Sequence, residues 1–546
     1  MTYRRTGDNE MGLRHRFSLD SERSSVLSPS DEHAEREFLV ASLVLTTLLT
    51  VVVPVVALTT GLSVLPLVGL AGVVYAGVAL GRNSVFEGLG SALFVLVVFN
   101  ANVPLVAGPG PARADLLFVD AALVPLVCLL AYRAYTTSPS LSFDARTLAV
   151  ACLGGFVAWS FAAAVVANGQ SRPAAFMFGV FQLRNLLLLL AGAFVVRETS
   201  VWCGIDALVV GTGGNLAFAL AEALEGNTFG LTVLGEIGGG YIGRVVVGDI
   251  SLHSGLYPGA FAGSSRVLTG IVLLSLPVAV LALRRRGRWG TIGAAAYVFA
   301  ASLLVRISST DAGLMALLLT LVIAIAVLLY DAYRGTTGGS LSTVATFAFG
   351  IAATVWLFAL RQVRDGGGGR QSGIDGGESS APNTGGPATA TDPTRIETHL
   401  TELLTRVPLV STNTFSVRLQ QYAAAIRIGG EYPLFGLGGF NFGLLAGSYG
   451  LQTRREVHNT FFAYLAATGI PGLLAYLTSI TLVVGVALHR ALVGRKHGLV
   501  WGMVAAGMIG FHAFSFWVTL HTSATAYGAF WALSGLVIGY EDRGNG

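Results

Sequence analysis

The run AGLMALLLTLVIAIAVLLY, residues 312–330, contains no charged residue. A helix of about 20 apolar residues spans the hydrocarbon core of a bilayer. Similar runs recur along nearly the whole 546-residue chain, which is 53% hydrophobic and 12% charged, whereas soluble domains carry about 25% charged residues. The strands of a membrane barrel would be shorter and would alternate in polarity. The sequence therefore predicts an all-α polytopic integral membrane protein.

The apolar runs predict about 12 to 14 transmembrane helices. Their expected positions are 38–58, 62–80, 89–106, 116–132, 148–167, 175–196, 201–224, 267–283, 289–305, 312–330, 341–360, 460–488, 499–518 and 526–540. A large hydrophilic segment separates the last three of these spans from the others.

Polarity divides the chain into five regions. Residues 1–37 are polar and form a predicted disordered cytosolic tail, followed by an N-terminal transmembrane bundle over 38–361. Residues 362–396, rich in Gly, Ser, Pro and Thr, predict a flexible extracellular loop. Amphipathic helices and a glycine-rich turn are expected over 397–458. The region 459–546 returns to transmembrane helices.

Arginine is unevenly distributed between the loops. One alternating set of short loops carries Arg82, Arg133, Arg146, Arg197, Arg284, Arg285, Arg286, Arg288, Arg334, Arg490, Arg495 and Lys496. Basic residues in short loops mark the cytoplasmic side of a membrane protein. Both termini are therefore predicted to be cytosolic, and the two long loops, 225–266 and 361–458, are predicted to face outward from the cytoplasmic membrane.

His458 is the principal catalytic candidate, because it lies at the predicted outer end of a span. An imidazole there can titrate near neutral pH and serve as a general base. Its neighbour Asn459 and the turn containing Gly436, Gly438 and Asn441 are supporting candidates. Glycine permits positive φ and close backbone approach to a ligand. The alternative interpretations are a helix-capping histidine, an ordinary turn, and an asparagine that caps it.

Arg418 is the principal candidate for binding phosphate, because a guanidinium forks onto two phosphate oxygens. The alternative is an arginine that binds ordinary lipid phosphates at the interface, and this alternative is favoured for Arg427, Arg454 and Arg455. A second phosphate-binding arginine is expected in the other outward loop, where Arg244 is preferred, although a plain loop charge is equally consistent with the sequence.

Charges within the spans form a further group of candidates, since ionisable residues inside a membrane are functional candidates by default. Arg184 is expected either to reach a phosphate or to pair with Asp206, and structural pairing is expected for most of the group. The three cysteines form no CxxC or Cys/His pattern, so neither a disulfide framework nor a zinc site is predicted.

The C-terminal half resembles the O-antigen ligase and polymerase family. The resemblance rests on Arg418 in an amphipathic segment, PLFGLG at 433–438, HNTFF at 458–462 and TGIPG at 468–472, in this order. The family also carries an arginine at the start of a central span. Here Asp311 occupies that position and Arg306 lies five residues earlier. Either Arg306 takes over the donor-binding role, or the donor is bound differently.

The resemblance implies an enzyme, a metal-independent glycosyltransferase without a cofactor. It would move a glycan from a polyprenyl phosphate or pyrophosphate donor to a glycan, lipid or protein acceptor at the outer face of the membrane. Its partners would be these substrates and membrane lipids, with no nucleic acid. A polymerase of lipid-linked repeat units is the close alternative. Two alternatives from other classes are a lipid or glycan transporter, which predicts matching broken helices in two halves, and a sensor or scaffold.

Overall fold

A computed structural model of the protein is mainly helical. It describes residues 85–100, 102–106, 114–137, 144–166, 171–229, 241–247, 250–255, 259–308, 310–334, 341–359, 362–363, 412–451, 457–493, 497–518, 520 and 523–541. Within these ranges nine helices are long and apolar enough to cross a membrane. The chain is therefore a multi-pass, all-α membrane protein, as predicted. The first two predicted spans, the cytosolic tail and most of the flexible loop lie outside the described residues.

The described helices follow the apolar runs closely. They are α3 Val85–Leu96, α4 Asp120–Thr137, α5 Ala145–Val166, α6 Arg172–Glu198, α7 Val201–Glu225, α8 Ser265–Arg284, α9 Gly287–Ile307, α10 Asp311–Tyr333, α11 Leu341–Ala359, α13 Thr412–Glu431, α14 Phe442–Leu445, α15 Thr460–Val493, α16 Gly498–Ser515 and α17 Ala524–Gly539. The strands are β1 Asn102–Val106, β2 Ala114–Leu117, β3 Tyr241–Val247, β4 Ile250–Gly255 and β5 Gln362–Val363. Short 3-10 helices cover Ala260–Ala262 and Ala446–Tyr449.

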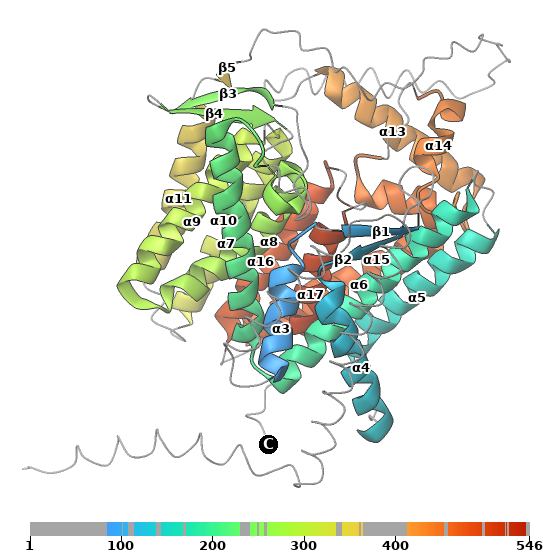
Figure 1. Ribbon diagram of the computed structural model, residues 1–546, viewed down its shortest axis with the longest axis horizontal. Coiled ribbons are helices and arrows are strands. Elements are labelled where there is room, and N and C mark those ends of the chain that lie inside the picture. Colours follow the sequence, from blue (N-terminus) through green and yellow to red (C-terminus); the bar gives the residue numbers. More distant parts are fainter. Residues whose placement is uncertain are drawn as a thin grey trace, which may run out of the picture.

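The helices form two lateral groups joined by the C-terminal pair. Helices α7 to α11 lie on one side of the view in Figure 1, and α5, α6 and α15 lie on the other. Between them, α16 packs against α8, α10 and α15, and α17 packs against α6 and α8. The last two helices thus join both groups into one bundle, and their side chains are almost entirely buried.

The third predicted span differs from the structure. Helix α3 ends at Leu96, and the second part of the expected span forms strand β1, which pairs antiparallel with β2. Pro104 lies in β1, and proline lacks the N–H that a helix interior requires. The backbone N–H of Asn100 donates to the carbonyl of Phe261 at 2.6 Å. Irregular backbone at membrane depth is tolerated where other parts of the protein satisfy it.

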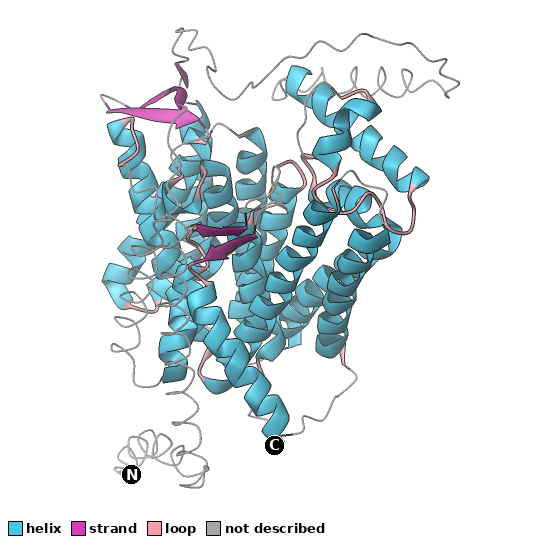
Figure 2. Cartoon of the chain, turned by 45° about the vertical axis from the view of Figure 1, so that its right-hand side comes forward, coloured by secondary structure: helices cyan, strands magenta, loops and turns pink. Residues whose placement is uncertain are grey.

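The described arginines of the predicted cytosolic loops gather at one end of the bundle, called here the arginine end. Contacts link the last residues of α17 to the arginines of three other helices: Arg146 donates to the carbonyl of Tyr540, Arg197 pairs with Glu541, and Arg490 donates to the carbonyl of Val537. Strands β3 to β5 and helices α13 and α14 lie at the opposite end (Figure 2). We call this the histidine end, because His458 precedes α15 there.

Candidate active site

His458 is positioned by the start of α15. The side-chain oxygen of Asn459 accepts the backbone N–H groups of Phe461 at 2.8 Å and Phe462 at 3.1 Å. These are two of the N–H groups that a helix start leaves without an intrahelical acceptor. Asn459 is therefore the cap of α15, and His458 stands one residue outside the helix.

Gln421 of α13 fixes the orientation of the His458 ring. The backbone N–H of His458 donates to Oε1 of Gln421 at 3.1 Å, and Nδ1 of the imidazole lies 2.9 Å from the same oxygen. A backbone N–H can only donate, so the shared atom is the amide oxygen, and Nδ1 must also donate to it. In the neutral ring Nε2 then holds the lone pair. His458 is thereby held in the tautomer that suits a base acting through Nε2.

Tyr422, next to Gln421, connects His458 to a charged cluster. Its hydroxyl donates to the carbonyl of His458 at 3.1 Å, and its ring stacks on Phe462 with centroids 4.9 Å apart. Burial raises the pKa of the Tyr422 hydroxyl, and the positive charge of Arg418 opposes this rise. Burial in turn lowers the pKa of the Arg418 guanidinium, while Tyr422 and Asp311 oppose that change.

Asp311 brings the predicted donor-binding arginines together. Asp311 is the first residue of α10. Its carboxylate interacts electrostatically with Arg418 and with Arg306, which lies in the last turn of α9. Arg306 is 7% exposed, donates through Nε to the carbonyl of Leu357 at 3.1 Å and lies over the ring of Phe358. Asp311, the residue that departs from the family pattern, therefore interacts electrostatically with both guanidiniums.

Two buried donors on the face of α13 that contacts His458 have no hydrogen-bond acceptor among the described residues. They are Nε of Arg418 and Nε2 of Gln421. Gln421 as a whole is 1% exposed. Buried polar groups in folded proteins are nearly always hydrogen-bonded, so such a pair requires an explanation. Both groups are donors, which suits them to a ligand rich in oxygen acceptors.

The glycine-rich turn approaches a break in α15. Gly469 has φ 69° and ψ −169°, which interrupts the helix, and the N–H of Ile470 donates to the carbonyl of Pro433 at 2.8 Å. The N–H groups of Leu437 and Gly438 donate to two carbonyls of α15, those of Ala466 at 2.8 Å and Ala467 at 3.0 Å. Gly436 has φ +60°, and a Cβ there would lie 2.4 Å from the carbonyl oxygen of Ala466. The close backbone approach expected of Gly436 and Gly438 is thus made to α15.

Asn441 holds the same turn against α6. Its side-chain oxygen accepts the backbone N–H of Ser171 at 2.8 Å, and its Nδ2 donates to the carbonyls of Ser171 and Leu437 at 3.1 and 3.2 Å. Ser171 is the cap of α6. The contacts of Asn441 are those of a residue that positions the backbone of the turn.

Arg244 lies apart from this cluster. Arg244 is exposed on β3, opposite His253 of β4, over the group formed by α7 to α11 (Figure 1). Arg427 pairs with Glu431 at 2.8 Å, and Arg454 and Arg455 fall outside the described residues.

The ion pair of Arg184 within the spans differs from the predicted pairing with Asp206. Arg184 forms a two-pronged ion pair with Asp120, at 3.1 and 2.9 Å, and not with Asp206. Asp206 instead pairs with Arg285 and Arg286. Among the residues that the structure describes, no group of three or more His, Cys, Asp and Glu side chains is arranged to hold a metal ion.

Sequence reasoning missed Gln421 and Tyr422. Both follow Arg418 in the amphipathic run VRLQQY, where a glutamine and a tyrosine are ordinary residues for a helix at a membrane surface. A signal was nevertheless present: Arg418, Gln421 and Tyr422 are spaced by three and four residues, which places them on one face of a helix.

Residues 260–477 match the family model described as O-antigen ligase. The matched stretch begins just before α8, includes α9, α10 and α13, and ends in the second part of α15. No curated protein matches the chain. The family match confirms the resemblance that the C-terminal motifs indicated. The matched residues include Arg306, Asp311, Arg418 and His458.

Proposed function

We propose that the protein transfers a glycan from a polyprenyl phosphate or pyrophosphate donor to an acceptor hydroxyl at the outer face of the cytoplasmic membrane. The family match supports glycan processing of the O-antigen ligase and polymerase type. The observation that carries the finer proposal is the arrangement beside His458, where an oriented imidazole adjoins two buried donors without acceptors.

The proposed donor site uses Arg418 and Arg306. The phosphate that links lipid and glycan carries negative charge, and this charge increases when the bond to the sugar breaks. Guanidiniums already in place in a desolvated site stabilise such a leaving group without reorganisation. Gln421, through its buried Nε2, supplies a further hydrogen bond to a phosphate or sugar oxygen.

The proposed chemical step uses Nε2 of His458 as the base. It accepts the proton of the acceptor hydroxyl as the hydroxyl oxygen bonds to the anomeric carbon of the donor glycan. The bond between that carbon and the phosphate oxygen breaks, and the electron pair leaves with the lipid phosphate. Holding donor and acceptor in one site contributes a large part of the rate through proximity.

The location of the site supports the proposed orientation. His458 and Arg418 lie at the end of the bundle opposite the arginine end, and arginine-rich short loops mark the cytoplasmic side. A lipid-linked donor in the outer leaflet would reach the site laterally from the bilayer.

The test replaces His458 with alanine in the native host and compares lipid-linked glycans with mature surface glycans. His489→Ala is the matched control, since His489 is an exposed histidine near the other end of the same helix. We expect His458→Ala to lower transfer by about 10² to 10⁴-fold, the usual contribution of a general base. Lipid-linked donor should accumulate at normal protein level, and His489→Ala should match the wild type.

The form of the defect separates the two activities of the family. Loss of whole chains from the surface, with full-length lipid-linked chains retained, indicates a ligase. Surface chains reduced to single repeat units indicate a polymerase. Unchanged glycans in both pools would contradict the proposal and would favour the transporter or scaffold interpretation.

A further inference from the structure

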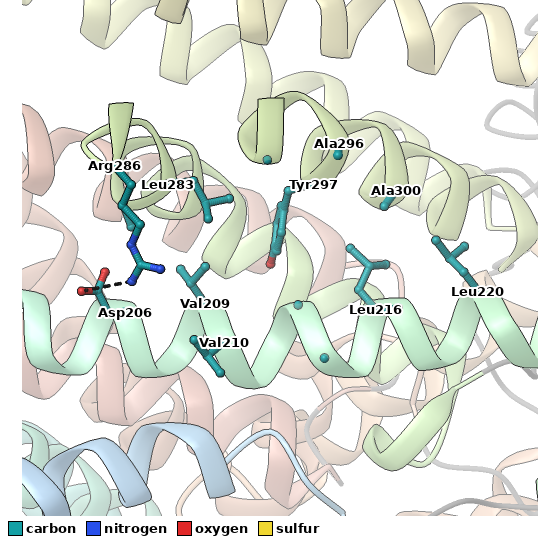
Figure 3. Close-up of a pocket in the computed structure, with 15 residues that line it drawn as sticks. Asp206, Val209, Val210, Leu216, Leu220, Leu283, Arg286, Ala296, Tyr297 and Ala300 are labelled. Carbon is teal, nitrogen blue, oxygen red and sulfur yellow. Dashed lines mark ion pairs between the residues drawn. The ribbon is translucent and has the colours of Figure 1, made fainter. Parts of the chain in front are cut away.

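A groove opens between α7 and α9 on the other side of the bundle from His458. It encloses about 390 Å³, within the range of roughly 300 to 1,000 Å³ typical of ligand sites. Its lining is almost entirely apolar, and Figure 3 shows Asp206 and Arg286 at one end and Leu220 at the other. The inner wall includes Tyr297, whose hydroxyl is already hydrogen-bonded to Ser275 at 2.9 Å.

The groove exists because small residues line both helices. A Cβ added at Gly214 of α7 would meet nothing within 4 Å, and one at Gly293 of α9 would meet only the end of Leu283 at 4.0 Å. Val210 at the groove is 60% exposed. Both helices are candidate membrane spans, so these open apolar surfaces face the lipid phase.

The mouth of the groove is strongly basic. Arg285 pairs with Asp206 and lies over the ring of Trp202, with 4.1 Å to its centroid. Arg286, whose side chain is 56% exposed, lies 3.8 Å from the same carboxylate, and Arg288 is exposed in the first turn of α9. One carboxylate thus faces two guanidiniums, with a third arginine two positions further along the chain, and the mouth carries an excess of positive charge.

The mouth of the groove lies at the level of the membrane surface. Trp289, beside Arg288, is 80% exposed, and exposed tryptophans of membrane proteins concentrate at the headgroup level. From Asp206 to Leu220 the groove follows α7 for about 20 Å, whereas the hydrocarbon of one leaflet is about 15 Å thick. The groove therefore extends from the headgroup level through the depth of that leaflet.

We propose that the groove binds one anionic phospholipid from the leaflet at the arginine end. The phosphate lies between Arg286 and Arg288, and one acyl chain lies along α7 over Gly213 and Gly214. The excess of positive charge at the mouth selects an anionic headgroup over a zwitterionic one. The inference is independent of the transfer reaction, since it uses neither His458 nor Arg418.

The test is native mass spectrometry of the full-length protein in detergent, with added phosphatidylglycerol or phosphatidylcholine of identical acyl chains. We expect the wild type to retain phosphatidylglycerol at about tenfold lower lipid concentration, because each arginine near an anionic headgroup strengthens its binding. Arg286→Gln combined with Arg288→Gln should remove this preference. Gly214→Leu, which fills the groove, should reduce retention of both lipids.

Gly155→Leu is the matched control, because Gly155 is an exposed glycine in the middle of α5 with nothing within 4 Å of an added Cβ. It should bind lipid like the wild type. Equal retention of the two lipids by the wild type would overturn the proposal, as would undiminished retention by Gly214→Leu. Co-purification of a polyprenyl lipid displaced by neither phospholipid would also overturn it and would assign the groove to the donor chain.

Discussion

The two ends of the bundle use arginine in different ways. At the arginine end the guanidiniums neutralise carboxylates and helix ends: Arg197 pairs with Glu541 at 3.3 Å, Arg133 pairs with Glu198 at 3.3 Å, and Arg490 donates to backbone carbonyls. At the histidine end Arg418 is half-buried, interacts electrostatically with Asp311, and has an Nε without an acceptor among the described residues. The number of arginines therefore does not mark the site.

This difference separates arginines that stabilise the fold from arginines that are available to bind a ligand. An exposed arginine whose donors are already hydrogen-bonded to a carboxylate or a backbone carbonyl contributes little to binding an anion, because those donors are used and solvent screens the charge. A desolvated guanidinium with an unused donor has a stronger interaction available for an incoming anion. The predictions below test this contrast, beginning with the largest expected effect.

Replacing Arg418 with glutamine should reduce glycan transfer by about 10²-fold or more, the usual result of removing one preorganised donor from a transition state. Arg427→Gln is the matched control, since Arg427 lies on the same helix with a 68% exposed side chain and pairs with Glu431. The measurement is the rate of transfer from lipid-linked donor in membranes at matched protein level. Equal activity of the two variants would remove the contrast between buried and paired arginines.

Replacing Gln421 should change the pH dependence of transfer, because Gln421 orients the base. Gln421→Leu leaves Nδ1 of His458 without its acceptor and should lower the rate by about tenfold or more. Gln421→Glu places a carboxylate at the same position, which favours the imidazolium, and the acid limb of the rate profile should move to higher pH. A purely structural glutamine would lower the rate in both variants without moving that limb.

Gly436→Ala tests the contact between the turn and α15. The added Cβ would lie 2.4 Å from the carbonyl oxygen of Ala466, at φ +60°, and such strain costs about 1 to 3 kcal/mol. The midpoint of thermal unfolding in detergent should fall by a few degrees. Gly447→Ala is the control, with nothing within 4 Å of its Cβ, and it should unfold like the wild type. Equal midpoints for Gly436→Ala and the wild type would show that the turn accommodates the added Cβ without loss of stability.

The smallest expected effect concerns pH and the end of α13. The Tyr449 hydroxyl and Arg427 both donate to Glu431 at 2.8 Å, and these hydrogen bonds hold the pKa of Glu431 below its ordinary value. A lowered pKa stabilises the fold above the ordinary value near 4.5, and this contribution is lost as the pH falls through the lowered pKa.

The pair is exposed, so its contribution is below about 1 kcal/mol. Glu431→Gln should therefore unfold slightly earlier than the wild type at pH 7, and the difference should vanish in acid. Thermal unfolding of both proteins at pH 7 and near pH 3 would measure it. A difference that grows in acid would contradict the assigned sign.

The spans could be predicted from sequence because a membrane helix is a long apolar run with little other requirement. The predicted spans at 148–167 and 312–330 correspond to helices Ala145–Val166 and Asp311–Tyr333. For the run at 89–106, the sequence did not predict that the helix ends at Leu96, because apolar residues suit both a helix and a buried strand. The contact of Asn100 and the β1–β2 pairing show which of the two forms.

The candidate site was partly predictable, for a different reason. His458 and Arg418 stand in recognisable motifs, so sequence alone singled them out. The electrostatic interaction of Asp311 with Arg418 joins residues about a hundred positions apart, on α10 and α13, and no local pattern encodes it. Likewise, the turn at Gly436 is typical of ligand loops and of close helix packing alike, and only the break at Gly469 shows which backbone it approaches.

Helices α10 and α15 both begin at the histidine end, at Asp311 and Thr460. The aligned peptide dipoles of a helix place about half a positive elementary charge at its start. This potential belongs to the main chain, so side-chain substitution does not remove it, and it adds to the charges of Arg306 and Arg418. The carboxylate of Asp311 can therefore stand beside the two guanidiniums while the surrounding field still attracts anions.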